Sequence, residues 1–254
     1  EYLGTSDMTP EQVKSEFFRM GCSFNVKPGS ERTYVSISGL AENMPKAIAL
    51  FEKLMADAQV NAPAYINLVG DILKSRVDAK ANQGTNFSQL RQYVTWGPEI
   101  KKTIPSAQEL QTANPQELVD RIHNIFSYKH RILYYGPASE KELIALLDKE
   151  HRTPETLKDI PAGVELKQAN TEETKIFVAP YDAKQIYMSQ FSHRNEKYDI
   201  NIEPTRQMYS EYFSGGMNSI VFQEMRESRG LAYTAYAGLA SPSFQKYDYT
   251  FISY

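Results

Sequence analysis

The two ends of this chain present the same order of local signals, and that order constrains the fold more than any single motif does. Residues 15–26 and 32–38 (SEFFRMGCSFNV and RTYVSIS) predict a helix, a stopping glycine, a strand, a turn and a partner strand. Residues 221–237 and 247–253 (VFQEMRESRGLAYTAYA and YDYTFIS) predict the same series. Because few letters match, we interpret the two segments as a weak internal repeat. The repeat indicates an α+β fold with two related domains, each a mostly antiparallel sheet covered by helices.

Other segments predict the remaining elements. The first helix begins at Thr9, whose hydroxyl precedes a proline and stands three residues before Gln12, and we expect it to end at Gly21. The letters KPGSE predict a hairpin turn. Helical spacing recurs at residues 44–58, 62–93, 114–126, 139–151 and 203–230, and strand-like runs occur at 130–137, 174–180, 184–192, 231–239 and 246–254. A polar, proline-bearing stretch predicts domains at residues 1–150 and 171–254, joined by a linker at 151–170.

Composition excludes several classes of partner. The chain of 254 residues has a net charge of −3 with its Lys and Arg residues spread out, so it has no basic stripe for nucleic acid. A single cysteine, Cys22, excludes an internal disulfide framework and a cysteine-cluster metal site. The apolar runs are shorter than the roughly 20 residues that a membrane-spanning helix needs. These signals leave the cellular compartment open.

The first and last residues predict that this chain is a piece of a larger protein. The sequence opens at Glu1 rather than at an initiator methionine, and YDYTFISY at the other end reads as a strand without a terminating turn. We therefore expect the second domain to be truncated. An open strand edge near Tyr254 would favour pairing with another chain, so we expect a homodimer in some preparations.

Arg226 and Tyr233 are the strongest candidate functional residues. Arg226 lies in the last turn of a predicted helix, and Tyr233 follows Gly230, a natural left-handed cap. If the strand after Gly230 folds back, a guanidinium and a phenol converge as two donors, which suits a peptide carbonyl or the oxyanion formed when it is attacked. A structural interpretation is equally open, in which Arg226 complements the helix dipole and Tyr233 is an amphipathic strand residue.

The segment SGGMNSIVFQEMRESRGLAYTAYAG resembles the signature of the fourth domain of pitrilysin/insulinase-type zinc metallopeptidases, the inverzincins. Residues 2–26 and 33–55 are similar to the third, zinc-free domain of that family. The resemblance implies four homologous α+β domains in two clamshell halves, of which this chain would be an inactive third domain and the opening part of the fourth. By the same resemblance, Arg226 and Tyr233 would act on the substrate carbonyl in the active site of the other half. Gly215, Gly216 and Asn218 would line the substrate chamber, although a tight turn and a helix cap at Asn218 or Ser219 explain them equally.

The sequence departs from the family at the zinc site. An inverzincin needs His-x-x-Glu-His on a helix, but in LLDKEH the place of the first histidine is taken by Leu147. No pair among the four histidines stands four residues apart, and we expect no metal role for any of them. Zinc is therefore expected in the amino-terminal half, on the same chain or on a partner subunit, and not here.

Three functions remain open at this stage. The leading hypothesis is the carboxyl-terminal half of a zinc metalloendopeptidase that encloses a peptide or protein substrate, inactive by itself. The alternatives are a non-catalytic assembly subunit of the same fold and a peptide-binding module without hydrolysis. The family resemblance favours a periplasmic or cell-envelope location.

Overall fold

The computed structural model describes residues 2–29, 32–242 and 247–254. The chain forms two compact units that interleave along the sequence, unit 1 from residues 1–73 and 106–163 and unit 2 from residues 74–105 and 164–254. This division follows spatial contacts, whereas the predicted linker at residues 151–170 follows a polar, proline-bearing stretch of the sequence. The two divisions describe different things, and the predicted domain bounds stay a prediction.

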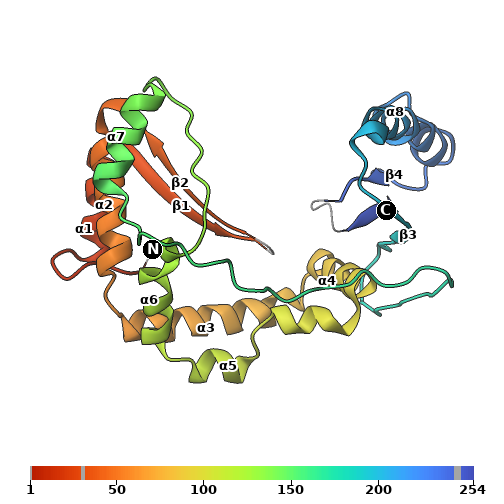
Figure 1. Cartoon of the computed structure of the whole chain (residues 1–254). Helices are drawn as coiled ribbons and strands as arrows, with labels where there is room; N and C mark the ends of the chain where they lie inside the picture. The colour runs from red at the N-terminus through yellow and green to blue at the C-terminus, as the bar shows by residue number, and fades with distance from the viewer. Residues whose placement is uncertain (1, 30–31, 243–246) are drawn as a thin grey trace. The chain divides into compact units, whose positions relative to one another are not determined.

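Unit 1 is a two-stranded antiparallel hairpin with helices packed against it (Figure 1). The predicted hairpin is present, and its register runs from Cys22 opposite Gly39 to Pro28 opposite Thr33. Ser30 and Glu31 of the predicted turn lie outside the described residues. The helices α1 and α2 contact the hairpin, and α2 also contacts α6 and α7. The elements are α1 (Pro10–Arg19), β1 (Cys22–Pro28), β2 (Thr33–Gly39), η1 (Ala41–Asn43), α2 (Met44–Asp57), α5 (Ala107–Thr112), α6 (Pro115–His123), η3 (Ile125–Ser127) and α7 (Glu140–Glu150).

Local signals at both ends of α1 explain why it occupies these residues. The Thr9 side chain accepts a hydrogen bond from the Gln12 backbone N–H, and the Gln12 side chain accepts one from the Thr9 backbone N–H. This capping box and Pro10 satisfy the first turn. At the other end Gly21 has a φ of 59°, a left-handed conformation that glycine adopts without a Cβ penalty. The predicted start and stop of this helix are confirmed.

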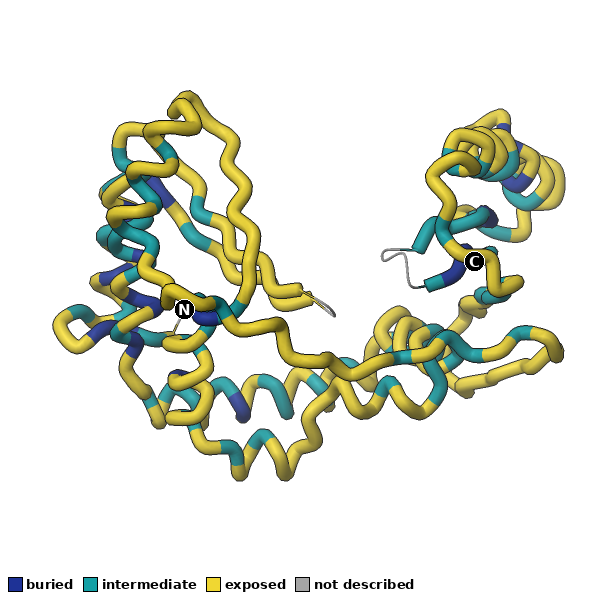
Figure 2. The backbone as a smooth tube through the Cα atoms, in the orientation of Figure 1, coloured by how far each residue is buried: buried dark blue, intermediate teal, exposed yellow. Residues whose placement is uncertain are grey.

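The core of unit 1 lies between the hairpin and two helices. It is built around Phe17 of α1 and Phe51 of α2, both almost fully buried, with the half-buried Phe24 of β1 between them. The other members of this core are Val13, Cys22, Ala47, Leu54 and Met55. Figure 2 shows these buried stretches on the helices, whereas most of the hairpin is exposed.

Unit 2 contains a three-stranded antiparallel sheet in the order β3-β5-β4, with α8 in contact with β4. Tyr249 of the central strand is 2% exposed and is the most buried aromatic among the described residues of this unit. The boundary between the units falls inside α3 (Ala62–Ala79). The other elements are α4 (Gln83–Trp96), η2 (Gly97–Thr103), β3 (Gln190–Lys197), η4 (Ile200–Ile202), α8 (Glu203–Ser214), η5 (Phe222–Ser228), β4 (Ala237–Ala240) and β5 (Asp248–Ser253). No helix in the described ranges is long and apolar enough to cross a membrane.

Several predicted strands are wrong. Residues 130–137 and 174–180 form no strand, only the last three residues of 184–192 enter β3, and the run at 231–239 reaches the sheet only from Ala237. Leu133 in the first of these segments is 84% exposed. Among the described residues, β1 and β2 form a two-stranded sheet, and residues 130–137 pair with neither strand. An apolar alternation permits a strand, but hydrogen bonds to a neighbour make one. The helix predicted at 62–93 is broken at residues 80–82 into α3 and α4.

Candidate functional site

The candidate site of unit 2 is built on η5, a π-helical segment that continues a short helical turn at residues 220–221, which Ser219 caps. The Ser219 hydroxyl accepts a hydrogen bond from the Phe222 N–H, and the Ser219 carbonyl accepts one from Gln223. Ser219 therefore makes the cap that the sequence left open between it and Asn218. A π-helical turn is rare and is frequently found at functional sites.

The chain reverses directly after η5. Gly230 has a φ of 59°, and its N–H donates to the carbonyl of Arg226, while the Leu231 N–H donates to the carbonyl of Met225. These two hydrogen bonds satisfy carbonyls at the end of the helix, so the predicted left-handed cap at Gly230 is present. The next residues, 231–236, form neither helix nor strand.

This reversal brings Arg226 and Tyr233 together. The guanidinium carbon of Arg226 lies 4.3 Å from the centre of the Tyr233 ring and 4.9 Å from the centre of the Phe222 ring. Both are cation–π contacts. Tyr233 approaches from an irregular segment and not from the expected strand, and it is 81% exposed. Sequence reasoning missed Phe222 as a member of this group, although its position four residues before Arg226 is the signal that could have found it.

The polar ends of the pair remain accessible. The Arg226 Nε lies 3.5 Å from a carboxylate oxygen of Glu227, an ion pair at the surface. Within the described part of the chain, neither the Tyr233 hydroxyl nor the terminal nitrogens of Arg226 form a hydrogen bond. The phenol O–H of Tyr233 and the N–H groups at the edge of the Arg226 guanidinium lie on the same stack. Both can therefore donate to one oxygen atom of a ligand.

The glycine pair before η5 has a structural role at one position. Gly215 ends α8 by donating to the Glu211 carbonyl, and a Cβ built there would come within 2.3–2.5 Å of atoms of Glu211. A Cβ at Gly216 meets nothing within 4 Å. Asn218 is exposed beside them. The steric requirement at Gly215 explains that residue by itself, and substrate contacts of Gly215, Gly216 and Asn218 stay predictions.

Unit 2 also contains a polar network that sequence reasoning missed. The Tyr249 hydroxyl donates to Glu203 Oε1 at 2.7 Å, and the same carboxylate pairs with Arg206 at 3.1 Å and accepts from Ser241. The hydrogen bond from Tyr249 is the main cause that lowers the pKa of Glu203. Burial, together with that carboxylate, raises the pKa of Tyr249. The network ties the start of α8 to the central strand and so positions the helix that precedes the candidate site.

The residues of this chain do not fit the zinc site of an inverzincin. Leu147, on α7, has no donor atom, and no group of three or more His, Cys, Asp or Glu side chains among the described residues could hold a metal ion. His123 and His193 each direct Nε2 to a backbone carbonyl, of Ala58 and Ala169 respectively. Those two rings have structural hydrogen bonds of their own.

Comparison with known proteins places this fold. No family model matches the chain. A curated relative described as an uncharacterized zinc protease from Rickettsia bellii is 25% identical over 258 residues, covering 98% of this chain and 60% of its own length. The peptidase M16 inactive domain from Pseudomonas fluorescens superposes with a TM-score of 0.68 at 15% identity, covering 98% of this chain and 60% of that one. The periplasmic protease PqqL from Escherichia coli gives a TM-score of 0.72 at 12% identity, covering 98% of this chain and 27% of that one.

These findings confirm the resemblance to the zinc-free half of pitrilysin-type zinc proteases, and with it the α+β fold class. The chain spans about 60% of the length of that Rickettsia bellii relative. The similar structures are below 25% identity and therefore establish the fold, while function has to be argued from the site.

Proposed function

We propose that this chain, which has the fold of the zinc-free halves of pitrilysin-type zinc proteases, encloses a peptide against a zinc-bearing half and supplies two hydrogen-bond donors to its scissile carbonyl. The donors are the guanidinium of Arg226 and the hydroxyl of Tyr233. The zinc ion, held by the other half on the same chain or on a partner subunit, would supply the attacking water. This chain alone would be inactive, and a periplasmic or cell-envelope location is part of the proposal.

The observation that supports the proposal most is the stack of Arg226 on Tyr233 at 4.3 Å. The stack orients two donors that have accessible polar ends, in a segment that forms neither a sheet ladder nor a buried core. A donor positioned before the reaction stabilises the oxyanion without reorganisation, which is where such groups gain most of their effect. A purely structural role would not need Tyr233 at 81% exposure.

The test is peptide cleavage by the full-length protein, or by the complex with its zinc-bearing half, in Arg226→Ala and Tyr233→Phe variants. Tyr233→Phe keeps the ring on which Arg226 stacks and removes only the hydroxyl. Loss of one oxyanion donor costs about 10²–10³ in kcat, and we expect each variant to fall by that factor with a smaller change in KM. Cleavage should also be abolished by a zinc chelator.

Tyr212→Phe is the matched control, because Tyr212 lies on α8 in the same unit and is 70% exposed. It should cleave at the rate of the unmodified protein. Unchanged kcat in both Arg226→Ala and Tyr233→Phe would overturn the assignment of the two donors. Absence of chelator-sensitive cleavage by a folded, zinc-loaded assembly would overturn the peptidase function and favour the assembly subunit.

A further inference from the structure

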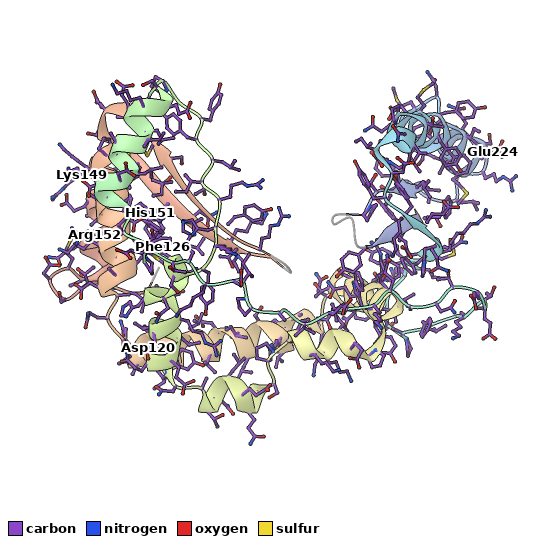
Figure 3. The ribbon with its side chains drawn as sticks, in the orientation of Figure 1. Asp120, Phe126, Lys149, His151, Arg152 and Glu224 are labelled. Atoms are coloured by element: carbon purple, nitrogen blue, oxygen red, sulfur yellow. The ribbon has the colours of Figure 1, made fainter. Side chains whose placement is uncertain are left out.

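Unit 1 contains a pair of histidines that the function proposed above does not use. His130 follows η3, and His151 caps the end of α7. Their Nε2 atoms lie 2.9 Å apart. Phe126 covers the two rings from one side, with centroid distances of 6.1 Å to His130 and 4.8 Å to His151. Figure 3 shows Phe126 and His151 next to each other at the end of α7.

The other nitrogen of each ring is committed to an acceptor. His130 Nδ1 lies 2.7 Å from the carbonyl oxygen of Tyr128, which can only accept. His151 Nδ1 lies 2.6 Å from a carboxylate oxygen of Glu52 on α2, and the two side chains are only 11% and 16% exposed. Each Nδ1 therefore carries the proton, and in the neutral tautomer each Nε2 presents a lone pair. The two Nε2 atoms face each other across 2.9 Å, so they either share a proton in an N–H···N hydrogen bond or both bind one metal ion.

The surroundings match those of metal-binding histidines. A ligating histidine almost always donates its other ring N–H to a carboxylate or to a backbone carbonyl, which sets the tautomer and aims the free nitrogen. His151 has the carboxylate of Glu52 and His130 has the carbonyl of Tyr128. Each ring thus has its own orienting acceptor, and the rings converge from two different segments of the chain.

The nitrogen separation also suits a metal ion. Bonds of about 2.0–2.1 Å place two nitrogen ligands about 2.9 Å apart at a right angle and about 3.4 Å apart at a tetrahedral angle. The observed 2.9 Å is at the lower end of that range. His130 belongs to an exposed segment without helix or strand, so small adjustments are open to it and water can reach the remaining coordination positions.

The charges around the pair favour a cation. Glu52 contributes a negative charge at the rear of His151, and the C-terminal end of α7 adds the negative end of a helix dipole. Lys149 of the same helix is held by the carboxylate of Glu150 at 2.7 Å, and Lys129 by that of Asp159 at 2.5 Å. Arg131 and Arg152 are next to the two histidines in sequence, and the ammonium of Lys158 lies over the ring of Tyr128 at 6.0 Å.

We infer that His130 and His151 form a binding site for one divalent ion of the kind that prefers imidazole, Zn²⁺, Ni²⁺ or Cu²⁺, through their Nε2 atoms, with water as the other ligands. The inference departs from the expectation that no histidine of this chain has a metal role, and the titration below decides between them. Sequence spacing could not reveal the pair, because its members are 21 residues apart. The site is distinct from the zinc-binding motif that the chain lacks, and it does not depend on the proposed peptidase function.

The test is calorimetric titration of the chain with ZnCl₂ and with NiCl₂ in a buffer that does not bind metals. We expect one equivalent to bind to the unmodified chain. His130→Asn and His151→Asn should each weaken binding by at least about tenfold, because one of two protein ligands is lost. Glu52→Gln keeps an acceptor for His151 but removes its charge, and should weaken binding by about 10–100-fold.

His123→Asn is the matched control, since His123 lies in the same unit and its Nε2 already contacts the Ala58 carbonyl. It should bind with unchanged affinity. Circular dichroism of each variant verifies folding, and bound metal should raise the melting temperature only where both His130 and His151 are present. No binding by the unmodified chain at 1 mM metal, or equal affinity in both histidine variants, would overturn the inference.

Discussion

The reversal at Gly21 in unit 1 and the reversal at Gly230 in unit 2 have the same local geometry and different chemistry. Both glycines have a φ of 59° directly after a helix. In each unit the residue four positions before the glycine contacts the residue three positions after it. In unit 1 these residues are Phe17 and Phe24, with ring centres 4.9 Å apart. In unit 2 they are Arg226 and Tyr233, at 4.3 Å from guanidinium carbon to ring centre.

The comparison teaches that the left-handed glycine brings the two positions together, whichever side chains occupy them. The side chains then decide what the contact does. Phe17 is 3% exposed and anchors the core of unit 1, whereas Tyr233 is 81% exposed. The same backbone device therefore serves packing in one unit and presents two donors in the other.

A second difference is where the strand begins after the glycine. In unit 1, β1 starts at Cys22, immediately after Gly21, so Phe24 belongs to the hairpin ladder. In unit 2, β4 starts only at Ala237, and Tyr233 lies in the irregular segment between. Because the strand starts later, Tyr233 takes no part in the hydrogen-bond ladder of the sheet, and its hydroxyl stays accessible.

The largest expected effect separates the two pairs by stability. Phe17→Ala should lower the free energy of unfolding by about 3–5 kcal/mol, because it opens a cavity in the core of unit 1. Arg226→Ala should lower it by less than about 1 kcal/mol, since only an exposed cation–π contact and a surface ion pair are lost. Urea unfolding followed by circular dichroism measures both. Equal losses would show that the pair in unit 2 is also a packing pair.

A smaller effect tests the shared glycine. Gly21→Ala and Gly230→Ala should each destabilise the chain by about 1–2 kcal/mol, because a side chain is forced into a left-handed conformation. The loss should be larger at Gly21, where the new Cβ would lie 3.0 Å from Leu40 Cδ1, than at Gly230, where it meets nothing within 4 Å. Gly70→Ala inside α3 is the control and should stabilise by about 0.5–1 kcal/mol. Thermal melts of the three variants measure these changes. If Gly21→Ala and Gly230→Ala raised the melting temperature as Gly70→Ala does, the two glycines would not share the proposed left-handed role.

The last expected effect concerns acid pH and sharpens the contrast between a packed core and a polar network. The pKa of Glu203 is lowered from its ordinary value of 4.5, chiefly by the hydrogen bond from Tyr249. A lowered pKa in the folded state gives stability that is present above pH 4.5 and is lost as the pH falls through the folded value. Glu203→Gln and Tyr249→Phe should both reduce the loss of stability on acidification. Unfolding curves at pH 7 and pH 3 measure it, and an unchanged pH difference in both variants would contradict the assignment.

Much of the helical structure could be predicted because its signals are local. The capping box at Thr9, the left-handed glycines and the apolar periodicity of α2 and α7 involve residues within one or two turns. The strand at residues 130–137 was predicted wrongly, because a strand depends on a neighbour that the sequence pattern does not name. The shift of the predicted strand at 184–192 to Gln190–Lys197 has the same cause, since its register with β5 decides its ends.

The sequence by itself determined the repeated helix–glycine–strand order, the absence of the His-x-x-Glu-His motif and the identity of Arg226 and Tyr233 as candidate residues. All three are properties of neighbouring letters. Only the tertiary structure decided that Phe222 joins Arg226 and Tyr233 in one stack and that Tyr233 leaves the sheet. It also decided that His151 meets both His130 and Glu52. The reason is physical. Contacts across a chain reversal or between separate helices depend on how the backbone folds, and local propensity carries no information about which distant residues the fold brings together.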